Sequence, residues 1–182
     1  ATTLSVTATD GDGDTLTWSV LTQGSKGTMT VGGPGPTVTA TSTPTANLNG
    51  SDVVVIRVSD GHGGTDTITV NVTITAVNDA PAFTKGANQT VLEDAGARTV
   101  ASWATAISAG PSDEAAQTFT FAVTNTNNTL FSAQPAVATN GTLTFTPAAN
   151  TSGSATVSVS MTDSGGTANG GVATSAVQTF TI

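Results

Sequence analysis

The stretch from Val58 to Phe83 limits what this chain can fold into more than any other part of the sequence. Residues 60–64 read D-G-H-G-G, and glycine accepts the positive φ angles that close a tight turn between two strands. From Thr67 to Ala76, Thr and Asn alternate with Ile and Val, which gives a strand one apolar and one polar face. Pro81 biases the residue before it toward an extended backbone. We therefore expect a strand, a hairpin turn, a long strand and a stiff connector into a second unit.

The composition also favours short strands over helices. Thr, Val, Ser, Ala, Gly and Asn dominate the 182 residues, which include 20 Gly and 7 Pro; these are residues of strands and turns. The regular alternation of Val, Ile and Phe argues against disorder. A chain of this length folds as one large β domain or as two domains of about 80–100 residues each. Cysteine is absent, so neither disulfides nor thiol chemistry can operate.

The charge balance excludes several classes of partner. The chain has 12 acidic and 4 basic residues, for a net charge of −8. Nucleic acids and anionic membrane surfaces require basic patches, so we expect neither as a partner, whereas cations would be attracted. A run of about 20 apolar residues is also lacking, so no membrane insertion is expected. His62 is the only histidine, so we expect neither a His-based catalytic triad nor a zinc site with several histidines, and we expect no enzyme.

Two halves of the sequence repeat one scheme. A single shift of 103 residues aligns three separate features: Asp10 with Asp113, T-L-T-W at 15–18 with T-F-T-F at 118–121, and Asp60 with Asp163. This agreement predicts two copies of one unit, which we place at residues 1–79 and 80–182. A fourth likeness, between G-T-M-T at 27–30 and G-T-L-T at 141–144, needs a shift of 114. It predicts an insertion near residues 124–136.

The second copy begins with a segment that the first copy lacks. Residues 83–101 precede the acidic turn of copy two, whereas Ala1 already lies in the strand before Asp10. We therefore expect the first copy to lack its N-terminal strand. An unpaired sheet edge invites pairing with another strand. Two explanations stay open: the sequence was truncated there, or a neighbouring chain supplies the strand.

Three motifs resemble the cadherin-like repeats of large bacterial surface and secreted proteins: T-A-T-D-G-D-G-D-T-L-T-W-S at 7–19, V-S-D-G-H-G-G-T-D-T at 58–67, and V-N-D-A-P-A-F at 77–83. The resemblance covers the first copy closely and the second loosely. It implies an all-β chain of two tandem Ig-like, cadherin-like Greek-key β-sandwiches, the first lacking its N-terminal strand. It also implies an extracellular location, at the cell surface or secreted.

The same resemblance implies calcium sites, because repeats of this family bind calcium at their ends through clustered acidic residues. Calcium takes six to eight oxygen ligands. The implied ligands are Asp10, Asp12, Asp14 and Asp60 at the leading end of copy one, and Asn78, Asp79, Asp113, Glu114 and Asp163 at the junction to copy two. Copy two departs from the family, since D-E-A-A at 113–116 replaces the Asp-x-Asp pattern. Plain turn chemistry is the alternative for each acidic turn.

Three functions fit these features. The first is a non-catalytic extracellular structural or adhesion module, a stalk or repeat unit stiffened by calcium, whose partners are neighbouring repeats or other copies. The second is a filament subunit assembled by β-strand donation into the open edge of the first unit. The third is a carbohydrate-binding module for surface polysaccharide, which needs exposed aromatic rings. Trp18 alternates with Leu16 and Val20, so we expect it in the core instead.

Overall fold

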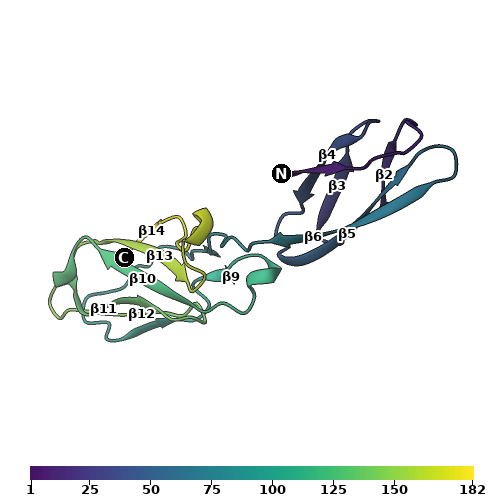
Figure 1. Cartoon of the computed structure of the whole chain (residues 1–182). Helices are drawn as coiled ribbons and strands as arrows, with labels where there is room; N and C mark the ends of the chain where they lie inside the picture. Colours follow the sequence, from purple (N-terminus) through teal and green to yellow (C-terminus); the bar gives the residue numbers. More distant parts are fainter. The chain divides into compact units, whose positions relative to one another are not determined.

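A computed structural model describes residues 1–182 and divides them into two compact units, residues 1–76 and 77–182 (Figure 1). The boundary lies before the expected one at residue 79, because two polar residues already bond to the second unit. The carbonyl of Asn78 accepts from Val172 N at 2.8 Å, and Asp79 N donates to Glu114 Oε1 at 2.9 Å. The regular elements are β-strands and short 3₁₀ turns. None of these turns has the length and apolar character of a membrane-spanning helix.

The first unit consists of two three-stranded antiparallel sheets. One sheet has the order β1-β4-β3, and the other has the order β2-β5-β6. The strands are β1 (Thr2–Thr7), β2 (Thr17–Thr22), β3 (Gly27–Val31), β4 (Thr37–Pro44), β5 (Gly50–Ser59) and β6 (Thr65–Ile74). The chain changes sheet after β1, β2 and β4, which is the connection pattern of a Greek-key sandwich.

Alternating residues of β5 form the centre of the first core. Val54 and Ile56 point inward and are buried, as the strand period of two requires. Trp18 is half-buried and packs against the same cluster, while its indole Nε1 donates to the carbonyl of Gly35 at 2.9 Å. Trp18 therefore belongs to the core, as its alternation with Leu16 and Val20 predicts.

The second unit repeats this arrangement and adds strands to it. One sheet has the order β10-β13-β14, a second has the order β11-β12-β8, and β7 pairs with β9. The strands are β7 (Ala82–Thr84), β8 (Arg98–Val100), β9 (Thr105–Ser108), β10 (Phe119–Asn125), β11 (Phe131–Val137), β12 (Leu143–Pro147), β13 (Thr156–Asp163) and β14 (Gln178–Thr181). The 3₁₀ turns are η1 (Ser112–Glu114), η2 (Asn128–Leu130) and η3 (Ala168–Gly170).

Strand register confirms the repeat of 103 residues. Trp18 lies opposite Val58 in the β2–β5 pair, and Phe121 lies opposite Met161 in the β10–β13 pair. Trp18 and Phe121 differ by 103 in residue number, and so do Val58 and Met161. The shift of 114 is wrong, because it would make β12 the counterpart of β3. The strand β12 is the central strand of its sheet and corresponds to β4, whereas β3 is an edge strand and corresponds to β11. Gly141 belongs to the turn between β11 and β12 and is not the counterpart of Gly27.

The second unit begins with a strand, β7, that has no counterpart within residues 1–76. Phe83, on β7, is buried against Phe121, with ring centroids 5.1 Å apart and the rings nearly perpendicular. Within residues 1–76 no strand takes this place, so β1 and β6 each have only one neighbour. The core clusters reflect the difference: six buried side chains in the first unit and twelve in the second.

Candidate cation site in the second unit

Asn78 is the centre of a polar cluster formed by residues distant in sequence. Its side-chain nitrogen Nδ2 donates to Asp163 Oδ1 at 3.0 Å and to the carbonyl of Val172 at 2.8 Å. Its Oδ1 accepts from Gln117 Nε2 at 2.8 Å. The first residues of the second unit are therefore attached to the end of β13 and to the segments after η1 and η3.

Two carboxylates of this cluster are buried and only partly satisfied. Glu114 is 7 % exposed and Asp163 is 8 % exposed. Glu114 Oε1 accepts from Asp79 N, and Asp163 Oδ1 accepts from Asn78 Nδ2 and from Gly165 N. The second oxygen of each carboxylate has no hydrogen-bond partner, and neither has Gln117 Oε1. All three atoms are acceptors, so a donor or a cation would satisfy them.

Local sequence explains how these side chains reach the cluster. Pro111 has a φ of −61° and precedes η1, whose single turn places Glu114 inward. Gly110 leaves the space that Glu114 occupies, because a Cβ at this position would overlap Glu114 Oε2. Gly165 does the same for Asn78, since a Cβ there would overlap Asn78 Oδ1. Asp163 is brought to the cluster as the last residue of β13.

The cluster agrees in part with the ligand set that the sequence implies. Asn78 bonds to Asp163, and Glu114 is joined to them through the backbone N–H of Asp79, whose side chain is exposed. Asp113 is exposed on η1. Sequence reasoning missed Gln117, although it follows Glu114 by three residues, the spacing that places two side chains on one side of a helical turn.

The donor set suits a hard cation. Calcium prefers carboxylate, carbonyl and amide oxygens, and the three unpartnered acceptors are of these kinds. No three His, Cys, Asp or Glu side chains gather as a metal-ligand group in the chain. A cation in the second unit would therefore be held by two carboxylates, with amide or carbonyl oxygens and water completing the shell.

The acidic turns of the first unit are organised differently. Asp10 Oδ1 accepts from Asp12 N and Asp14 N, both at 2.9 Å. These backbone donors, Asp14 first, hold the pKa of Asp10 below its usual value. Asp60 Oδ1 accepts from the backbone N–H of His62 at 2.8 Å. Each of these carboxylates closes its own turn, as turn chemistry predicts for Asp.

The two turns of the first unit nevertheless lie close together. His62 Nδ1 lies 3.1 Å from Asp14 Oδ2, and Asp10, Asp60 and Asp66 line one hollow of about 420 Å³. Asp12 is exposed and does not line it. The expected convergence therefore holds for Asp10 and Asp60, with Asp14 joined to the neighbouring turn through His62.

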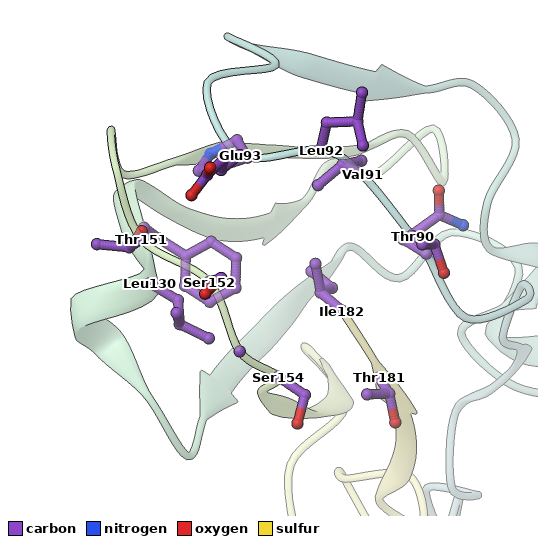
Figure 2. A pocket seen from close by; sticks show the side chains of 14 residues that line it. Thr90, Val91, Leu92, Glu93, Leu130, Thr151, Ser152, Ser154, Thr181 and Ile182 are labelled. Carbon is purple, nitrogen blue, oxygen red and sulfur yellow. The ribbon is translucent and has the colours of Figure 1, made fainter.

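The second unit also contains a hollow that lacks a cluster of acidic side chains. It measures about 320 Å³ and is surrounded by Val91, Leu92, Leu130 and Ile182 together with Thr, Ser and Glu side chains (Figure 2). Leu92 is 82 % exposed. Its lining mixes apolar and neutral polar groups and includes Glu93 as its one charged residue, so we do not assign it a ligand.

A family model of the bacterial Ig domain matches residues 1–73 and, separately, residues 78–178. The chain belongs to the bacterial Ig-domain family. The two matched segments correspond to the two units, so each unit is one bacterial Ig domain. No curated protein matches the chain in sequence.

Solved structures agree with this fold. The EC1-2 fragment of human protocadherin-24 superposes with a TM-score of 0.58 at 19 % identity, over 95 % of this chain and 83 % of that chain. This likeness confirms the predicted class, tandem Ig-like and cadherin-like β-sandwiches. Two structures of an endo-fucoidan hydrolase of glycoside hydrolase family 107, one of them the H294Q variant, give TM-scores of 0.34 and 0.32 at 16 % and 15 % identity. The match covers 94 % and 100 % of this chain but only 23 % and 25 % of the enzyme chains, and carries no argument.

Proposed function

We propose that this pair of bacterial Ig domains is a non-catalytic structural or adhesion module of an extracellular protein, stiffened by calcium. The observation that carries the proposal is the cluster around Asn78, where buried Glu114 and Asp163 each leave one oxygen without a partner. An unsatisfied buried acceptor destabilises the fold by about 1–3 kcal/mol. A bound cation would remove this penalty and neutralise the two charges.

Calcium would act here by fixing the chain where it enters the second unit. Asn78 and Asp79 already bond to Asp163 and Glu114, so a cation shared by the two carboxylates would hold the same segment from both sides. Binding to the folded form alone raises its stability by mass action, by about 2.7 kcal/mol at a calcium concentration of 100 Kd. The acidic turns at Asp10 and Asp60 are a second, more exposed candidate site.

Thermal unfolding in calcium and in chelator tests the proposal. We expect calcium to raise the melting temperature of the intact chain and to slow hydrogen exchange at residues 77–79 and 112–117. Glu114→Gln should abolish the response of these segments, whereas Glu93→Gln, the same change at an exposed position, should leave it unchanged. An unchanged melting temperature in calcium, or an equal response of both variants, would reject the site. A response confined to the Asp10 and Asp60 turns would place calcium in the first unit instead.

A second role, assembly by strand addition, is favoured by a different observation. The unpaired edges of β1 and β6 border a hollow of about 530 Å³, and unpaired edges recruit strands. Light scattering tests this role: a chain that receives strands from other copies forms large linear particles. A monomer at high concentration would count against filament assembly.

The carbohydrate-binding alternative receives the least support. A sugar-stacking platform needs exposed aromatic rings, and the aromatic side chains of this chain are buried or half-buried. Trp103, for example, is 3 % exposed and packs on Phe180 at a centroid distance of 4.4 Å. Titration with surface polysaccharide should therefore produce no change in tryptophan fluorescence.

A further inference from the structure

Asparagine followed by glycine occurs three times in the chain, at 49–50, 140–141 and 169–170. Such a pair can modify itself, because glycine has no Cβ to shield its backbone nitrogen from the side-chain amide of the preceding asparagine. Attack of this nitrogen on the amide carbon requires the backbone to open locally, so the contacts around each pair decide its reactivity. The three pairs differ widely in these contacts.

The pair at Asn140 is held by hydrogen bonds on both of its residues. Gly141 N donates to the carbonyl of Ala138 at 2.8 Å, and the side-chain oxygen of Asn140 accepts from Thr142 N at 3.0 Å. Ala104 N also donates to the carbonyl of Gly141 at 2.9 Å, which attaches the turn to a neighbouring segment. All three bonds oppose the rotation that would bring the glycine nitrogen to the asparagine amide.

The pair at Asn49 is held by strand pairing and by a lysine. Gly50 is the first residue of β5 and lies opposite Ile74 on β6. Lys26 Nζ donates to the carbonyl of Asn49 at 2.6 Å, and the same Nζ would lie only 2.8 Å from a Cβ at Gly50. Asn49 and Gly50 are both half-buried. The backbone of this pair is therefore fixed in place.

The pair at Asn169 is the exposed one. Asn169 and Gly170 form the end of η3, both are exposed, and no side chain caps the turn. Their φ angles of +57° and +87° are the two positive angles of a type I′ turn, which asparagine and glycine favour. A Cβ at Gly170 would meet no atom within 4 Å, so open space surrounds this part of the turn. Local opening is therefore easiest at this pair.

From this comparison we propose that Asn169 is a site of spontaneous deamidation and reacts faster than the other two Asn-Gly pairs. The backbone nitrogen of Gly170 attacks Cγ of Asn169, and the new C–N bond closes a succinimide ring. The side-chain nitrogen leaves as ammonia, with the proton of the Gly170 nitrogen. One water then opens the ring at either carbonyl. The products are aspartate and isoaspartate; each adds a negative charge, and isoaspartate also lengthens the main chain by one methylene.

The modified turn is attached to Asn78, the centre of the polar cluster. Val172 N donates to the carbonyl of Asn78, and Asn78 Nδ2 donates to the carbonyl of Val172, both at 2.8 Å. Gly171 packs so closely that a Cβ there would lie 3.0 Å from Asn78 Cβ. A main chain lengthened at residue 169 displaces Gly171 and Val172 from these positions. Isoaspartate therefore loosens the attachment of Asn78, whether or not a cation binds to the cluster.

The test incubates the intact chain in mildly alkaline buffer with a chelator, so that the outcome does not depend on any cation. Mass spectrometry of peptides measures, at each pair, the replacement of ammonia by water. We expect residue 169 to be converted at least about tenfold faster than residues 49 and 140, which serve as internal controls. Hydrogen exchange at Val172 N, followed by NMR, should become faster in the converted chain than in the fresh chain.

Two variants separate the reaction from its consequences. Asn169→Gln keeps a side-chain amide but would have to close a larger ring, so we expect it to abolish conversion at this residue. Asn169→Glu carries the added charge without lengthening the main chain, and should leave hydrogen exchange at Val172 unchanged. Equal conversion at the three pairs, or faster conversion at residue 49 or 140, would overturn the proposal. Unchanged exchange at Val172 in the converted chain, or an equal increase in Asn169→Glu, would overturn the effect of the lengthened main chain.

Discussion

The side-chain amide of Asn78 donates a hydrogen bond of 3.0 Å to Oδ1 of Asp163, although 85 residues separate the two in the sequence. This bond attaches the segment that enters the second domain to the end of its central strand β13. The same amide group also contacts Val172 and Gln117. One short side chain thus connects three segments around the two buried carboxylates.

Asn78→Ala should destabilise the second domain by about 2–3 kcal/mol, because it removes the partner of Gln117 Nε2 and of the Val172 carbonyl and one of the two donors to Asp163 Oδ1. Urea unfolding followed by fluorescence of Trp103, the tryptophan of this domain, measures the effect in a Trp18→Phe background. Asn128→Ala, at an exposed position, is the control and should change stability by less than about 0.5 kcal/mol. Equal effects of the two substitutions would contradict a central role for Asn78.

Gly110→Ala should destabilise the second domain by about 1–3 kcal/mol, the usual effect of overpacking, because its Cβ would overlap Glu114 Oε2. The displaced carboxylate should also weaken the calcium response. Gly33→Ala is the control, since a Cβ there meets no atom within 4 Å. In the double variant Gly110→Ala/Glu114→Ala the two losses should be less than additive. Strict additivity would show that the glycine does not act through Glu114.

Acid should destabilise the first domain through Asp52. Its carboxylate accepts from Lys26 N and Ser25 N, both at 2.9 Å, and these donors lower its pKa from the ordinary value of 3.8. A group whose pKa is lower in the folded state stabilises the fold fully above its unfolded pKa. That contribution is lost as pH falls below 3.8 toward the lowered pKa.

Asp52→Asn should therefore lower the melting temperature at pH 7 and reduce the difference between pH 7 and pH 3. Melting followed by circular dichroism at several pH values checks this. Asp66→Asn is the matched control, because Asp66 is exposed and bonds only to its neighbour Thr67 N. If Asp52→Asn kept the full pH dependence of the original chain, Asp52 would not be a source of the acid sensitivity.

Two glycines with nearly the same backbone angle should respond differently to alanine. Gly141 has a φ of +80° and Gly166 a φ of +79°, so each Ala variant carries backbone strain of about 1–2 kcal/mol. A Cβ at Gly141 would also overlap the carbonyl of Ala104, whereas one at Gly166 would meet nothing. Chemical unfolding should show Gly141→Ala to be the more destabilising by at least about 2 kcal/mol. A smaller difference would mean that the turn before β12 relaxes easily.

The strands and the repeat could be predicted from the amino-acid sequence alone. Alternation of apolar and polar residues is a local signal with the period of a strand, so the range predicted at 67–76 corresponds closely to β6 (Thr65–Ile74). The shift of 103 holds in the register of Trp18 with Val58 and of Phe121 with Met161. The shift of 114 predicted from Gly27 and Gly141 was wrong, because a glycine followed by alternating residues occurs before an edge strand (β3) and before a central strand (β12) alike. The pattern therefore does not identify which strand follows.

Which polar groups contact one another could not be predicted before the fold was known. The acidic turn at Asp10 and the residues at Glu114 look equivalent in the sequence, but Asp10 is satisfied by its own turn whereas Glu114 is buried with one oxygen unpaired. The sequence did not predict Gln117 as a member of the cluster, because its role depends on a contact with Asn78, which is distant in the sequence. The hollow between β1 and β6, likewise, is lined by two strands that are distant in sequence. Hydrogen bonding and burial depend on residues that only the folded chain brings together. Strand periodicity, in contrast, depends on residues that are adjacent in the sequence.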